Sequence, residues 1–162
     1  MSIWLVEGWT KRACDVTCGI MALRVVLDTD VVVAGLASAA GASHRLLLAA
    51  LDGEIQLLLS TPLLLEYEAV LTRPAMLARA GVSAEEVLAV LDELAGVCAA
   101  VGFDYRWRPQ ARDPDDELVL ETAVNGGAEV IATFNVADMR AGARHFGIAV
   151  ERPGVVVRRI EG

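Results

Sequence analysis

Two carboxylates stand inside an apolar run near the start of the chain. Asp28 and Asp30 interrupt the stretch RVVLDTDVVVAG, residues 24–35, which is otherwise mostly valine, leucine and alanine. A carboxylate in apolar surroundings is costly unless another group compensates its charge. A buried partner, a phosphoryl group or a metal ion would each serve, and the position of the other acids decides between them.

The hydrophobic pattern predicts an alternation of strands and helices. Short apolar runs indicate buried strands, whereas apolar residues three and four apart indicate helices. Strands are expected at residues 23–28, 54–60, 128–133 and 147–153, and helices at residues 43–52, 60–74, 83–101 and 113–127, with a short helix before the last strand. This order predicts an α/β fold, a three-layer α/β/α sandwich around a central parallel sheet of four to five strands.

Four acids fall where such a sheet binds ligands, outside the carboxyl ends of its strands. Asp28 ends the first strand, and Glu66 lies about one turn into the helix after the second. Asp116 opens the helix before the third long strand, and Asp138 follows that strand by five residues. Mg²⁺ and Mn²⁺ prefer carboxylate and water ligands. We therefore expect a divalent-cation site here, although a structural role in a turn stays an alternative for Asp28 and Asp30 taken alone.

Three stretches in this order resemble a known family, the PIN-domain ribonucleases, in the branch of toxin components of toxin–antitoxin pairs. The resemblance runs from about Arg24 to Pro153, and the stretches are VVLDTDVVVAGL, LLLSTPLLLEYEAVLTRP and RDPDDELVLETAVNGGAEVIATFNVADM. It implies a PIN-like fold and cleavage of RNA phosphodiester bonds with Mg²⁺ or Mn²⁺. The candidate catalytic and metal-binding residues that it implies are Asp28, Glu66, Asp116 and Asp138.

The last motif departs from the family pattern in one place. Asn135 stands where many relatives have a carboxylate, so it offers a carbonyl oxygen without a charge. Asp138 is expected to supply the missing charge. The resemblance implies supporting roles for Asp30, Thr133 and Asn135, with Asp30 holding a water or a ligand in place.

The charge of the chain restricts how it could bind RNA. The formal net charge is −8, which argues against non-specific affinity for nucleic acid. A local basic surface is still compatible with this charge. The candidate phosphate contacts are Arg106, Arg108, Arg112, Arg140 and Arg144, and Tyr105 or Trp107 is available for base stacking. The alternative is that these arginines are ordinary surface charges.

The sequence also predicts how the chain is divided into domains and which partners it has. Residues 1–20 lack a regular pattern and are expected to be a poorly ordered extension, with residues 21–162 forming a single domain. No apolar run reaches the roughly 18 residues of a membrane helix, so we expect a cytoplasmic protein without a membrane partner. A toxin role implies a cognate antitoxin, and the apolar faces of two helices are candidates for antitoxin or homodimer contact.

Two other functions stay open on the sequence alone. A strand ending in Asp-x-Asp is also the first motif of haloacid-dehalogenase-type phosphatases, in which Asp28 would be the nucleophile. That family needs a basic residue, usually lysine, near the phosphate, and the single lysine here, Lys11, precedes the first strand. The other alternative is a non-catalytic PIN-like binding module, which the uncharged Asn135 allows.

Overall fold

Five parallel strands form one sheet in the described part of this computed structural model, which covers residues 21–103 and 114–162, without the side chains of residues 114 and 115. The elements, in chain order, are β1 (Leu23–Leu27), α2 (Thr29–Ala37), α3 (Ala42–Leu51), β2 (Ile55–Ser60), α4 (Thr61–Leu71), α5 (Pro74–Ala80), α6 (Ala84–Val97), β3 (Ala99–Val101), α7 (Pro114–Gly126), β4 (Val130–Ala132), α8 (Val136–Ala143), the 3-10 helix η1 (Arg144–Phe146), β5 (Ala149–Glu151) and α9 (Pro153–Glu161).

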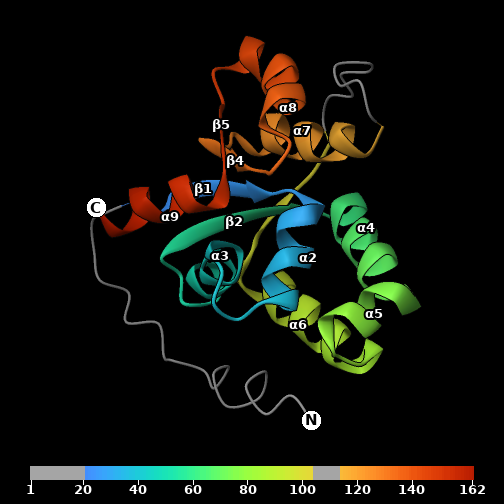
Figure 1. Cartoon of the computed structure of the whole chain (residues 1–162). Helices are drawn as coiled ribbons and strands as arrows, with labels where there is room; N and C mark the ends of the chain where they lie inside the picture. The colour runs from blue at the N-terminus through green and yellow to red at the C-terminus, as the bar shows by residue number, and fades with distance from the viewer. Residues whose placement is uncertain (1–20, 104–113) are drawn as a thin grey trace.

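The sheet has the strand order β3-β2-β1-β4-β5, and every pairing is parallel. Helices α7 and α8 cover one face, and α3, α6 and α9 cover the other (Figure 1). The chain moves outward from β1 to β2 and β3, and then returns across the sheet to β4 and β5 on the other side of β1. The predicted three-layer α/β/α sandwich around a parallel sheet is confirmed, with five strands.

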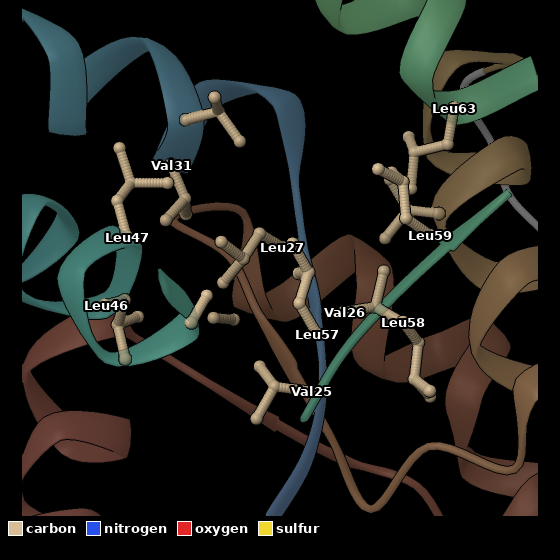
Figure 2. Packing of buried hydrophobic residues seen from close by; sticks show 14 of the residues in the cluster. Val25, Val26, Leu27, Val31, Leu46, Leu47, Leu57, Leu58, Leu59 and Leu63 are labelled. Carbon is tan, nitrogen blue, oxygen red and sulfur yellow. The ribbon is translucent and has the colours of Figure 1, made fainter. Parts of the chain in front are cut away.

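The last three residues of the central strand β1, Val25, Val26 and Leu27, are fully buried, which explains why this part of the strand is apolar throughout. Val25 and Leu27 point to the same side as Leu46 and Leu47 of α3, whereas Val26 points to the opposite side (Figure 2). Successive side chains of a strand alternate between its faces, so a strand covered by helices on both sides needs apolar residues at every position. Such a strand holds the residue that follows it, Asp28, in a fixed place.

The second strand positions two of the helices that carry candidate site residues. Ser60 ends β2, and its side chain caps α4 by accepting a hydrogen bond from the Leu63 backbone N–H at 3.4 Å. The Ser60 hydroxyl also lies 2.7 Å from the Thr122 hydroxyl of α7, in a buried contact. Ser60 therefore connects the start of α4, which carries Glu66, to α7, which carries Asp116.

Several sequence predictions differ from the structure. The helix expected over residues 83–101 ends at Val97, and Ala99–Val101 form β3, because a short apolar run that follows a helix fits either period. Helices α2 and α9 contain valine runs that favour a strand, so the sequence does not predict them, and α5 begins at Pro74, where a helix end was expected. Tertiary packing overrides the local preference in these helices.

The proposed extension at residues 1–20 lies outside the described residues. The division into an extension and one domain therefore stays a prediction. Within the described segments, no single helix is both long and apolar enough to cross a membrane, although α2 and α3, bent by 100°, pass that test of length and composition as a pair.

Candidate functional site

Asp28 lies between the end of β1 and the start of α2, where its backbone N–H donates to the Ala132 carbonyl at 3.0 Å. It occupies the N-cap position of α2, but its side chain makes no capping hydrogen bond to that helix. Instead, its Oδ2 accepts a hydrogen bond from the Thr133 hydroxyl at 2.6 Å. The side chain of Asp28 is thus directed toward the neighbouring strand, which argues against a purely local role in the turn.

The contact between Asp28 and Thr133 spans the switch point of the sheet. The chain leaves β1 toward β2 on one side, whereas β4 pairs with β1 on the other side. At such a point the loops after the two strands diverge and leave a crevice, in which open α/β sheets bind their ligands. Asp28 is only 8% exposed, and Thr133 is fully buried at the base of this region.

A chain of polar contacts continues from Thr133 to α7. The Thr133 hydroxyl accepts a hydrogen bond from the Asn135 backbone N–H at 3.0 Å. The Asn135 side-chain Nδ2 in turn donates to Oδ2 of Asp116 at 3.5 Å, which is a long and therefore weak hydrogen bond. Asp116 is also 8% exposed. Two buried carboxylates that are remote in sequence, Asp28 and Asp116, are therefore joined through Thr133 and Asn135; we call these four residues the acid chain.

Glu66 approaches the same region from α4. Its Oε1 accepts a hydrogen bond from the Thr29 hydroxyl at 3.0 Å, and Thr29 directly follows Asp28. The next residue, Tyr67, is fully buried and donates a hydrogen bond from its hydroxyl to the Leu27 carbonyl. Helix α4 is thus attached on both sides of Asp28, at the residue before it and at the residue after it.

The pKa of Tyr67 reflects these surroundings. Burial raises the pKa of its hydroxyl well above the ordinary value of 10.0, and the negative charges of Asp28 and Glu66 raise it further. Because both carboxylates act on one phenol, the structure brings Asp28 and Glu66 close to the same buried group. Sequence reasoning missed Tyr67, and its position next to Glu66 was the only available signal.

The remaining predicted residues are exposed or lie outside the described part. Asp30 and Asp138 are exposed residues in the first turns of α2 and α8. Arg140 is exposed, and its Nη2 donates to the Val150 carbonyl at 3.4 Å, while Arg144 is exposed at the end of α8. The other candidates for RNA contact lie outside the described residues: Tyr105, Arg106, Trp107, Arg108 and Arg112.

Comparison with known families fits this arrangement. The family model described as the PIN domain matches residues 24–137, which is most of the chain and includes three of the four predicted acids, Asp28, Glu66 and Asp116. The chain belongs to the PIN-domain family. A search of curated proteins found no match. Membership in the PIN family gives the chain a nuclease-type fold and favours nuclease chemistry over the phosphatase alternative.

PIN domains generally bind divalent metals, so the site can be tested for its fit to such an ion. Within the described residues, no three Asp, Glu, His or Cys side chains are grouped closely enough to hold a metal ion together. Mg²⁺, however, is usually bound by one or two carboxylates and keeps several waters, with substrate phosphates as further ligands. Asp28 and Asp116 meet that requirement in type and number, so the donor set fits Mg²⁺ or Mn²⁺.

Joint coordination by all four acids stays a prediction. Glu66 is directed to Thr29, and the exposed Asp138 lies on the first turn of α8.

Two further acids of this PIN domain, Glu117 and Glu121, are buried on α7 and were not predicted as site residues. Their spacing of four residues on one helix was a usable signal, because it places both side chains on the same face.

Proposed function

We propose that this PIN domain is an endoribonuclease that cleaves RNA phosphodiester bonds with Mg²⁺ or Mn²⁺. The observation that supports it best is the acid chain, in which Asp28 and Asp116 are joined across the switch point of the sheet. Buried carboxylates in this place are suited to a hard divalent cation, because water and oxygen ligands are what Mg²⁺ and Mn²⁺ prefer.

Four side chains would have separate roles in binding the cation. Asp28 and Asp116 would hold the cation, and Thr133 would fix the orientation of the Asp28 carboxylate through its 2.6 Å hydrogen bond. Glu66, held by Thr29, would bind the cation directly or through water. The bound ion would supply Lewis-acid activation of a water and of the scissile phosphate.

The exposed residues at the rim would complete the site. Asp138 would add the charge that Asn135 lacks, and Asp30 would hold a water near the cation. The five arginines predicted from the sequence would contact phosphates along the RNA. Because the net charge of the whole chain is −8, such contacts have to be local.

A toxin role in a toxin–antitoxin pair is the biological setting that we propose for this activity. The partner would be a cognate antitoxin in the cytoplasm, with a segment that covers the acidic rim. The exposed apolar residues Leu65 of α4 and Leu88 of α6 lie on the two helices that we propose for contact with the antitoxin or with a second copy of the chain. Co-purification with the product of a neighbouring gene would test this setting.

A comparison of two substrates tests the proposed reaction against its rival. A nuclease should cut single-stranded RNA with Mn²⁺, and Asp116→Asn should abolish cutting. A phosphatase should instead hydrolyse a simple phosphate monoester, form a covalent aspartyl-phosphate and lose turnover in Asp30→Asn. Monoester turnover without RNA cleavage would overturn the proposal. A non-catalytic module should cut neither substrate and should gain no stability from Mg²⁺ or Mn²⁺.

A further inference from the structure

Phe134 is an exposed aromatic residue at the edge of the sheet that carries the acid chain. Five large hydrophobic residues are exposed among the described residues, and Phe134, at 44%, is the aromatic one; the others are Met21, Leu65, Leu88 and Val97. Single exposed apolar residues are common and need no explanation by themselves. Its location between Thr133 and Asn135 is what distinguishes Phe134, because both neighbours belong to the acid chain.

The backbone on either side of Phe134 is held by hydrogen bonds. The Thr133 N–H donates to the Glu151 carbonyl at 3.0 Å, and the Thr133 hydroxyl accepts from the Asn135 N–H at 3.0 Å. The Asn135 carbonyl accepts from the Met139 N–H at 3.2 Å, in the first turn of α8. A side chain presented on such a fixed turn loses little backbone freedom when it binds a ligand.

We propose that Phe134 is a stacking platform for a nucleobase next to the bond that is cleaved. This inference rests on the proposed function and adds a substrate-binding residue to it. Thr133 contacts Asp28 and Asn135 contacts Asp116, so a phosphate bound at these acids would lie next to the turn that carries Phe134. In single-stranded RNA the bases on either side of that phosphate are unpaired and available for stacking on an aromatic side chain.

The charge of the protein makes such a contact useful. A chain with a net charge of −8 has no overall attraction for RNA, so phosphate contacts alone would have to work against the field of the protein. Base stacking does not depend on charge and tolerates every base. Affinity that comes from Phe134 should therefore be insensitive to salt, unlike affinity that comes from arginines.

Two substitutions at Phe134 distinguish the effect of the aromatic face from the effect of apolar bulk alone. Phe134→Leu keeps an apolar side chain but removes the aromatic face, whereas Phe134→Tyr keeps the face. With a short single-stranded RNA that the native chain cuts in Mn²⁺, we expect Phe134→Leu to raise KM by about 5- to 150-fold, the range for loss of one stacked base. Phe134→Tyr should stay near the native KM, and the dependence of KM on salt should keep its slope in both variants.

A modified substrate tests whether the ring acts through a base. RNA that lacks one base beside the cleaved bond should raise the KM of the native chain by a similar factor, and Phe134→Leu should then lose nothing more. Met21→Ala is the matched control, because Met21 is an exposed apolar residue that precedes β1, at the opposite edge of the parallel sheet from Phe134, which follows β4. Its KM should be native.

The outcomes separate this inference from the function on which it rests. A native KM in Phe134→Leu would overturn the stacking role, as would an equal loss on intact and base-lacking RNA, while RNA cleavage by the native chain would leave the proposed function standing. If the native chain cuts no RNA in Mn²⁺, the proposed function fails and the stacking role falls with it.

Discussion

The hydroxyl of Tyr67 donates a hydrogen bond to the carbonyl oxygen of Leu27, the last residue of β1. The pairing of β1 with β2 runs from Leu23 to Val25, whereas its pairing with β4 continues to Leu27. The Leu27 carbonyl therefore lies beyond the β1–β2 ladder, and a side chain of α4 supplies its donor. This contact fixes α4 next to Asp28, at the point where β1 and β2 separate.

Tyr67→Phe should destabilise the protein while leaving its fold unchanged. The substitution removes the donor and leaves a buried carbonyl without it, which costs about 1–3 kcal/mol. Equilibrium denaturation in urea measures the loss as a lower midpoint with an unchanged slope. A native midpoint would show that the Leu27 carbonyl does not depend on Tyr67.

The same variant should change how stability depends on pH. The pKa of Tyr67 is raised by burial and by Asp28 and Glu66, so the folded state holds the phenolic proton more tightly than the unfolded chain. The stability that this contributes is complete below about pH 10 and is lost as pH rises from there toward the folded-state pKa. Above pH 10 the native chain should therefore lose stability more steeply than Tyr67→Phe, and parallel curves would contradict the raised pKa.

Thr133→Val tests the hydrogen bond that orients Asp28. Removing a donor to a carboxylate costs about 1.5–3 kcal/mol of stability, and loss of a group that orients a metal ligand weakens metal affinity by about 10- to 100-fold. Titration calorimetry with Mn²⁺ measures the second effect. Thr133→Ser retains the hydroxyl and should keep most of the affinity, so equal affinities in the valine and serine variants would refute the orienting role.

Asn135→Asp places a carboxylate where the chain has an amide. Without metal, this variant should be less stable than the native chain, because a second charge replaces the Nδ2 donor that faces Asp116. With Mn²⁺ the variant should become more stable than the native chain, since tighter binding of the cation to the folded state adds stability. Thermal melting with and without Mn²⁺ measures both effects. If Mn²⁺ raises the melting temperature of Asn135→Asp no more than that of the native chain, Asn135 does not lie at the cation.

Joint replacement of Arg112 and Arg140 by alanine tests the phosphate contacts. Each lost contact should reduce the slope of the logarithm of RNA affinity against the logarithm of salt concentration by about 0.7. Arg159→Ala is the matched control, because Arg159 lies on another helix, α9. Its Nη1 forms an ion pair with Oε1 of Glu151 at 3.1 Å. An unchanged slope in the double variant would discard these two arginines as phosphate contacts.

The sequence predicted the sheet better than the helices around it. Residues 25–27 of β1, 57–59 of β2 and 130–132 of β4 are buried, so these continuous apolar runs identify the three strands without knowledge of the fold. Strand β3 follows α6 without a turn signal, and α2 carries a valine run that favours a strand. Local patterns cannot separate these alternatives, because the packing of distant segments decides them.

The candidate site was predictable in its acids but not in its contacts. Asp28 and Asp116 follow from their places at a strand end and a helix start, since carboxyl ends of parallel strands share one edge. The contacts from Thr133 to Asp28 and from Asn135 to Asp116 join residues that are 105 and 19 apart in sequence. No periodicity specifies such pairs, and the role of Tyr67 depends on where the β1–β2 ladder ends.

Cleavage of RNA with Mn²⁺ and with EDTA tests the central claim most directly, when the native chain is compared with Asp28→Asn. The native chain should cut single-stranded RNA in Mn²⁺ and lose that activity in EDTA, with recovery when Mn²⁺ is restored. Asp28→Asn should stay folded and cut no RNA in either condition. Cleavage by the native chain in EDTA, or native rates in Asp28→Asn, would contradict a divalent cation held at the end of β1.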